Sequence, residues 1–233
     1  MMDDSFKNYW MNKLKYFSLF ILLFAIYWFP DVILGYPEIY LKSLVGYDRQ
    51  ATATWIFLGN MAISLFLGIL IAIMLGIKNG FYKNAKRTLE WKNIILILIL
   101  IIPSVALDIL FSQFIQFHHL GRMDNQIAID SVMGSLLWFG KILGVALLAP
   151  ILEESIFRAS IYKIFSNNKI AFVFSSLLFT FMHSGYSWVF LIYLPMSLAV
   201  TFIYHRRRIL TDSIVFHSFF NLLITFVNFL MVN

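Results

Sequence analysis

Apolar residues run along this chain in long stretches separated by short polar segments. Seven such stretches can be drawn, and most of them reach the ~20 residues that an α-helix needs to cross a bilayer. The pattern predicts an all-α fold, a polytopic membrane helical bundle with about seven transmembrane helices. The stretches are Leu14–Leu34, Thr54–Ile77, Asn93–Phe111, Met133–Phe165, Ile170–Tyr186, Trp188–Tyr204 and Ile209–Val232.

The fourth stretch is too long for one straight span, and it contains Pro150. Proline removes a backbone donor, so we expect a kink or an interruption there. If Lys163 marks the membrane surface, the spanning part is about Lys141–Lys163. We therefore divide one integral membrane domain into N-terminal membrane helices and loops over residues 1–140 and a helical core over residues 141–233.

Basic residues gather in alternate loops, which is the distribution that the positive-inside rule describes. It predicts a cytosolic N-terminus and a multi-pass protein of the plasma membrane. The formal charge of +6 is thus explained by basic residues that orient the chain in the membrane, and nucleic acid is not expected as a partner. The basic clusters are Lys7, Lys13 and Lys15, then Lys78, Lys83, Lys86, Arg87 and Lys92, then Lys163 and Lys169, then Arg206, Arg207 and Arg208.

The composition is typical of a membrane protein and excludes functional sites that need cysteine. The chain of 233 residues is 61% hydrophobic and only 13% charged, whereas a soluble domain has about 25% charged residues. There are no cysteines, so disulfides, iron–sulfur clusters, thiolate zinc sites and cysteine nucleophiles are excluded.

Charged and imidazole side chains nevertheless lie inside three of the apolar stretches. A charged side chain in hydrocarbon costs a few kcal/mol or more, so it is expected to face a bundle interior and to have a function. Counted from the nearest cytosolic basic residue, the helical rise sets Glu153 ~15 Å, His183 ~21 Å and His217 ~14 Å into the membrane. Three helices are thus expected to bring polar groups to one layer.

The spacing within each helix suggests pairs. Glu154 and Arg158 are four residues apart and can pair on one face, and His217 and Asn221 share a face for the same reason. Glu153 points toward a different neighbour. It is the candidate general base, because a buried carboxylate is suited to take a proton from water.

Two chemical interpretations stay open for the remaining polar groups. In the first, His183 shares the attacking water, and His217 with Asn221 donates hydrogen bonds to an oxyanion. In the second, His183 and His217 hold a zinc ion together with a glutamate, and the metal activates the water. Both lead to hydrolysis of a peptide bond without a protein nucleophile.

Three short motifs resemble those of the CPBP family, the CAAX prenyl endopeptidase and bacteriocin-processing (Abi) intramembrane proteases. They cover about a third of the chain, and they stand in order on separate predicted helices. Many members have glycine after the arginine, where this chain has Ala159. The motifs are Glu153-Glu154-x-x-x-Arg158, Phe179-x-x-x-His183 and His217-x-x-x-Asn221.

The resemblance implies an intramembrane endopeptidase in which Glu153 activates water, with Glu154 and Arg158 as its support. It implies a membrane-associated peptide or protein as substrate and a role in peptide maturation or bacteriocin self-immunity. Members are called metalloproteases, and a metal-free glutamate mechanism is also argued, so Zn²⁺ stays open as a cofactor. The residues implied to assist the water or to bind the oxyanion are His183, His217 and Asn221.

Two rival functions remain to be distinguished. A non-catalytic scaffold of the same fold would regulate a partner, such as a cell-wall enzyme, and would have no need of a full set of costly polar groups. A transporter would show inverted repeats and interrupted helices in matching halves, and neither is visible in the sequence.

Overall fold

The computed structural model describes residues 4–29, 66–120 and 142–232. All regular structure in these ranges is helical, as predicted. Parts of the first, second and fourth predicted stretches lie outside the described residues, namely 30–34, 54–65 and 133–141. The count of seven spans and the cytosolic N-terminus therefore stay predictions.

The long helices follow the apolar stretches closely. α1 covers Asp4–Phe29 and α4 covers Trp91–Phe117, preceded by a short apolar helix, Phe66–Lys78, and by the 3-10 turn η3, Ala85–Leu89. α9 covers Asn168–Ser184, α10 covers Phe190–Arg207 and α11 covers Leu210–Val232. By length and composition, two of the described helices can cross a membrane: Trp91–Phe117 and the part Leu210–Asn228 of α11.

The described part of the fourth stretch alternates between π-helical and α-helical turns, and Pro150 lies next to one of these transitions. A π-helical segment, η4 (Ile142–Leu148), leads into α7 (Ala149–Glu154), in whose first turn Pro150 lies. A second π-helical segment, η5 (Ser155–Ser160), then leads into α8 (Ile161–Ile164). The interruption predicted at Pro150 is thus confirmed, and both glutamates fall on the α-helical turn between two wider ones.

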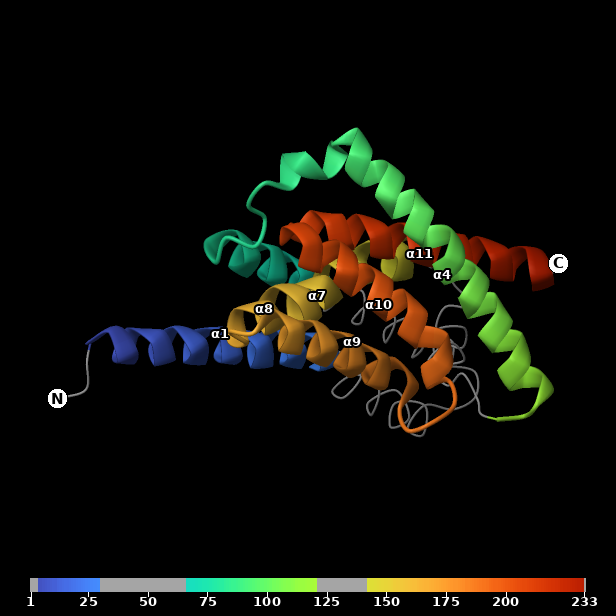
Figure 1. Cartoon of the computed structure of the whole chain (residues 1–233), viewed down its shortest axis with the longest axis horizontal. Coiled ribbons are helices and arrows are strands. Elements are labelled where there is room, and N and C mark those ends of the chain that lie inside the picture. Colours follow the sequence, from blue (N-terminus) through green and yellow to red (C-terminus); the bar gives the residue numbers. More distant parts are fainter. Residues whose placement is uncertain (1–3, 30–65, 121–141, 233) are drawn as a thin grey trace, which may run out of the picture.

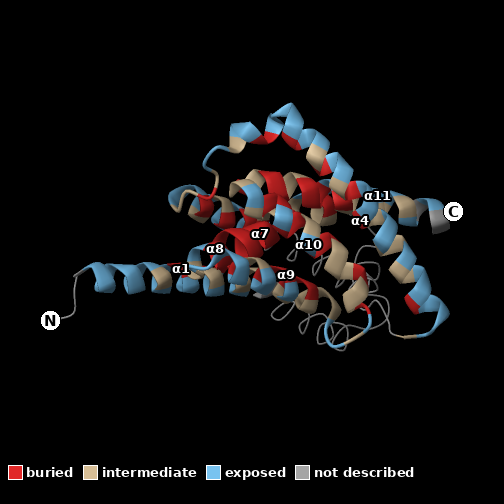
Figure 2. Ribbon diagram, viewed as in Figure 1, coloured by how far each residue is buried: buried red, intermediate tan, exposed pale blue. Residues whose placement is uncertain are grey.

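The interrupted helix lies at the centre of the bundle (Figure 1). α10 packs on α9, α4 and α11, while α11 also packs on η4 and α7. α1 lies along α8 and η5 on the other side. Figure 2 shows the consequence: buried residues gather on α7 and α8 and on the inward faces of their neighbours.

The outer faces of the helices are apolar as well. α4 exposes Leu98, Ile99 and Ile102, the last with 70% of its surface accessible. Soluble monomers rarely expose contiguous apolar surface of this kind, whereas hydrocarbon covers it without cost. The burial pattern therefore agrees with a bundle whose surroundings are lipid.

Candidate active site

Glu153 and Glu154 are both buried on α7, and each meets a different set of partners. Glu154 Oε1 accepts a hydrogen bond from Arg158 Nη1 at 2.9 Å, and neither side chain has any accessible surface. The pair predicted from the four-residue spacing is therefore confirmed. Each charge lowers the cost of burying the other, which allows two ionised groups to lie inside an apolar bundle.

His217 comes from α11 and contacts both glutamates. Its Nδ1 lies 2.8 Å from Glu154 Oε1, and since a carboxylate only accepts, Nδ1 donates. In the neutral imidazole the lone pair is then on Nε2, which lies 3.6 Å from Glu153 Oε2. Arg158, Glu154 and His217 thus form a chain that fixes the orientation of the imidazole ring.

His183 comes from α9 and is oriented in a similar way. Its Nδ1 donates to the backbone carbonyl of Phe179 at 2.8 Å, so the Nε2 of the neutral ring carries the lone pair. That Nε2 lies 3.8 Å from Glu153 Oε1. The two imidazoles therefore turn the same kind of atom toward the two oxygens of one carboxylate.

The ring of Phe179 contacts three side chains of the site. It lies 4.3 Å from the guanidinium of Arg158, is stacked on His183 at 4.2 Å and meets His217 edge-on at 5.6 Å. A cation over an aromatic face is stabilised, more so when water is excluded. Phe179 thus serves as an apolar support that also stabilises the charge of Arg158.

Asn221 lies one turn after His217, but its amide nitrogen is not directed at the glutamates. Nδ2 donates to the carbonyl of Val145 in η4 at 2.9 Å. Carbonyls of η5 also accept hydrogen bonds from side chains: the hydroxyl of Ser175 donates to Phe157, and that of Ser160 donates to Ser155. These side chains occupy carbonyls of the π-helical segments on both sides of α7. Binding of an oxyanion by Asn221 stays a prediction.

One contact of the site was missed by the sequence analysis. The hydroxyl of Tyr27 on α1 donates to Glu153 Oε1 at 3.0 Å. The depth argument would have found it, because Tyr27 follows Lys15 by twelve residues and so lies ~18 Å along its helix, close to the layer of Glu153. Only the charged and imidazole groups were placed by depth, so a tyrosine among apolar residues was left out.

The arrangement is suited to holding a water molecule beside Glu153. A carboxylate oxygen and an imidazole lone pair separated by 3.6–3.8 Å are too far apart for a direct hydrogen bond. A water between them can donate one hydrogen to each acceptor, and its own lone pairs then point away from both. Such a water is oriented for attack on a carbonyl carbon.

The zinc alternative would use side chains of this same cluster. Within the described ranges there is no group of three or more His, Asp or Glu side chains placed to bind one ion. In the site itself, Nδ1 of His217 and Nδ1 of His183 are both bonded to other partners, which leaves Nε2 of each ring as the atom that a zinc ion would use. The zinc mechanism stays an alternative prediction.

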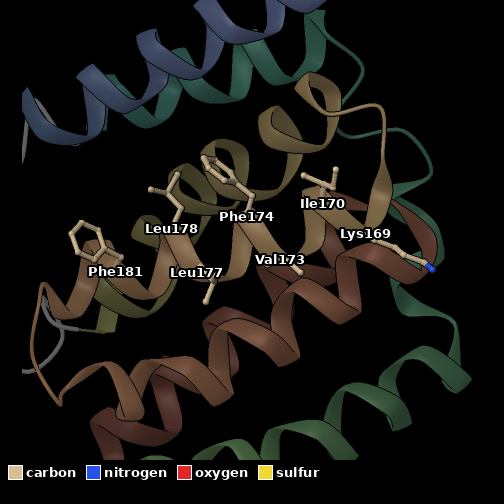
Figure 3. Close-up of a pocket in the computed structure, with 7 residues that line it drawn as sticks. All are labelled: Lys169, Ile170, Val173, Phe174, Leu177, Leu178 and Phe181. Carbon is tan, nitrogen blue, oxygen red and sulfur yellow. The ribbon is translucent and has the colours of Figure 1, made fainter.

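α9 has a second face, which is apolar and lies away from His183. A pocket of about 600 Å³ lies along it, and Figure 3 shows the side chains that line it. Apart from one lysine at its end, the lining is apolar, so the pocket is distinct from the carboxylate site on the inner face of the same helix. The lining residues are Lys169, Ile170, Val173, Phe174, Leu177, Leu178 and Phe181.

Comparison with known proteins identifies the family. Residues 133–223 match the family model "Type II CAAX prenyl endopeptidase Rce1-like". The chain is 78% identical over 200 residues to the UPF0177 protein YajF of Lactococcus lactis subsp. lactis, covering 86% of this chain and 96% of the relative. This chain belongs to the UPF0177 family.

Two further relatives extend the similarity over nearly the whole chain. The UPF0177 protein YaiH of the same organism is 56% identical over 96% of this chain and 93% of its own length. A UPF0177 protein in the abiGi 5' region of Lactococcus lactis subsp. cremoris is 49% identical over 95% of this chain and 94% of its length. No solved structure is significantly similar to the chain.

The family model confirms the resemblance inferred from the three motifs, all of which lie inside the matched residues. It points to a CAAX-type protease. Together with the two helices that are long and apolar enough to span a bilayer, it identifies this UPF0177 member as a membrane protein.

Proposed function

We propose that the chain is an intramembrane endopeptidase that hydrolyses a peptide bond with a water activated by Glu153. The observation that carries the proposal is the convergence of His183 Nε2 and His217 Nε2 on the two oxygens of the buried Glu153 carboxylate. A structural ion pair requires donors around a carboxylate, whereas these imidazoles present acceptors in their neutral form.

The reaction needs no covalent intermediate with the protein. Glu153 takes a proton from the water while the water oxygen attacks the carbonyl carbon of the substrate. The resulting oxyanion is stabilised by hydrogen-bond donors, a role we assign to the amide of Asn221 once it turns from Val145. Neutral His217, held by Glu154, accepts a hydrogen bond from the attacking water at Nε2. Glu153 then gives its proton to the leaving amine nitrogen, the C–N bond breaks, and the carboxylate is restored.

We further propose a multi-pass plasma-membrane protein of about seven spans with a cytosolic N-terminus, in which residues 141–233 form the catalytic core. Support comes from the alternation of basic loops and from the apolar outer faces of the helices. The substrate is a peptide or protein segment associated with the membrane. Peptide maturation and self-immunity to bacteriocins are the physiological roles we propose for this activity.

A labelling experiment tests the proposal without knowledge of the substrate. Cells that express the chain are compared with cells that express Glu153→Gln, and new peptide N-termini are labelled and identified by mass spectrometry in the membrane fraction. Glutamine keeps the shape of the side chain and removes its basicity. We expect N-termini that appear only with the unmodified chain, at equal abundance of the two proteins in the membrane.

The opposite outcome is equally clear. If Glu153→Gln inserts normally and yields the same N-termini, or if neither protein yields any, the endopeptidase proposal fails. The second result would favour the non-catalytic scaffold.

A further inference from the structure

The N-terminal helix lies outside the residues that match the protease family model, yet it reaches the candidate base. Tyr27 on α1 donates its hydroxyl hydrogen to Glu153 Oε1 at 3.0 Å, across 126 residues of sequence. Among the described contacts of Glu153 this one has hydrogen-bond distance, whereas the imidazole nitrogens lie at 3.6 and 3.8 Å. α1 therefore supplies part of the surroundings of the site.

The register of α1 is fixed at several points, so this contact is not the result of a loose helix. Leu23 lies one turn before Tyr27 on the same face and is fully buried. Toward the start of the helix, Tyr9 is hydrogen-bonded to Ser166, and Lys13 Nζ donates to the carbonyl of Lys163 at 3.0 Å. These contacts set the height at which the hydroxyl of Tyr27 meets α7.

The bond distinguishes the two oxygens of Glu153. Oε1 accepts the hydrogen bond from Tyr27, and a carboxylate held at one oxygen cannot rotate freely about its last side-chain bond. Oε2 stays turned toward His217, whose ring is itself held by Glu154. A fixed direction matters here because a misplacement of about 1 Å can cost roughly a hundredfold in rate.

We propose that Tyr27 is a positioning residue: its hydroxyl holds Glu153 Oε1 so that Oε2 is the oxygen that takes the proton from the attacking water. The inference rests on the proposed function and deepens it. α1 then contributes to the orientation of the catalytic carboxylate, although it contains none of the three sequence motifs.

The test uses Tyr27→Phe, which keeps the ring and removes the hydroxyl. Tyr16→Phe is the matched control, because Tyr16 lies on the same helix but its ring stacks on Phe81, three turns away from the site. Both variants are purified in full length and reconstituted in lipid vesicles. The probe is a synthetic peptide that spans the most abundant cleavage site found by N-terminal labelling.

For Tyr27→Phe we expect kcat to fall about 10- to 100-fold with KM unchanged, as loss of a hydrogen bond to a charged group predicts. Tyr16→Phe should keep the unmodified kcat. A helix that merely packs less well would change the amount of folded protein or KM instead. An unchanged kcat in Tyr27→Phe would overturn the inference while leaving the endopeptidase proposal intact.

A second readout does not depend on activity. The carboxylate band of Glu153 is isolated in the infrared spectrum as the difference between the unmodified protein and Glu153→Gln. Tyr27→Phe should shift this band and Tyr16→Phe should not. An unshifted band would contradict the contact itself. If the band shifts but the unmodified chain cleaves nothing, the proposed function falls, and the positioning role falls with it.

Discussion

Two clusters in this protein each combine a buried carboxylate with arginine, and they differ in how that carboxylate is satisfied. The carboxylate–imidazole cluster consists of Glu153, Glu154, Arg158, His183 and His217. The helix-end cluster joins η3 and the start of α4 to the turn between α10 and α11. Its members are Thr88, Glu90, Asn93, Arg206, Arg207 and Asp212.

Asp212 of the helix-end cluster is surrounded by donors. Its Oδ1 accepts from Thr88 Oγ1 at 2.7 Å and from Asn93 Nδ2 at 3.2 Å, and Oδ2 pairs with Arg207 Nε at 3.1 Å. Arg206 donates to the side chain of Asn93 from the other direction. Both oxygens of Asp212 thus face donors or cations, which is how a buried structural charge is stabilised.

Glu153 is surrounded differently. Among the described residues, Tyr27 donates a hydrogen bond to it at 3.0 Å, and two imidazole nitrogens face it from beyond hydrogen-bond distance. Burial of a carboxylate therefore does not by itself indicate catalysis. What distinguishes the candidate base is that its neighbours leave it able to accept a proton.

Removing the charge of Glu154 should give the largest effect on stability. Glu154→Gln leaves the fully buried Arg158 without its counter-charge, and breaking a buried pair costs about 3–5 kcal/mol. Cleavage should fall too, because the N–H of His217 then meets a neutral amide in place of the carboxylate that orients the ring. Unfolding in detergent followed by circular dichroism measures the first effect. A melting temperature equal to that of the unmodified chain would show that the pair does not stabilise the bundle.

Asp212→Asn should separate stability from activity. The amide keeps the shape but loses the ion pair with Arg207, which weakens hydrogen bonds worth about 1.5–3 kcal/mol when one partner is charged. We expect a lower melting temperature and an unchanged rate of cleavage per folded molecule. Loss of cleavage at full stability would mean that the helix-end cluster takes part in the reaction.

The exposed edge of the helix-end cluster should respond to pH. Arg87, by its hydrogen bond, and Arg207 nearby hold the pKa of Glu90 below its usual range. A carboxyl with a depressed pKa contributes stability above its unfolded value of about 4.3, and this contribution is lost as pH falls through the folded pKa. Melting temperatures of the unmodified chain and Glu90→Gln should therefore differ slightly at pH 7 and converge under acidic conditions. A difference that persists at low pH would refute this origin.

Removal of metal should have the smallest effect. If the side chains alone activate the water, dialysis against a chelator leaves cleavage of the reporter peptide unchanged. Activity that disappears on chelation and returns with zinc would instead support the zinc mechanism. Metal content measured for the unmodified chain and for His217→Ala would then show whether that histidine is a ligand.

Much of the site could be predicted from the sequence because its signals are local. The four-residue spacing of Glu154 and Arg158 fixes their pairing on one helical face. The constant rise of a helix in a membrane puts Glu153, His183 and His217 at similar depths, and the structure brings them together.

Other features depend on information that spacing does not contain. The depth of a residue in the membrane places it in a layer, but the rotation of each helix about its axis decides which side chains it contacts. The bond between His217 and Glu154 could therefore not be predicted. The same is true of Tyr27. Donors from other helices also bond to carbonyls of the π-helical segments, Ser175 to Phe157 and Asn221 to Val145, and spacing within one helix does not predict these pairs.

The most direct test compares Glu153→Gln with Asp212→Asn in one series of vesicle preparations. Melting temperature and the rate at which new N-termini appear are measured for both variants and for the unmodified chain. We predict opposite results: Glu153→Gln keeps its melting temperature and loses cleavage by about 10²-fold or more, whereas Asp212→Asn melts earlier and still cleaves. Cleavage by a well-folded Glu153→Gln at the unmodified rate would contradict this prediction.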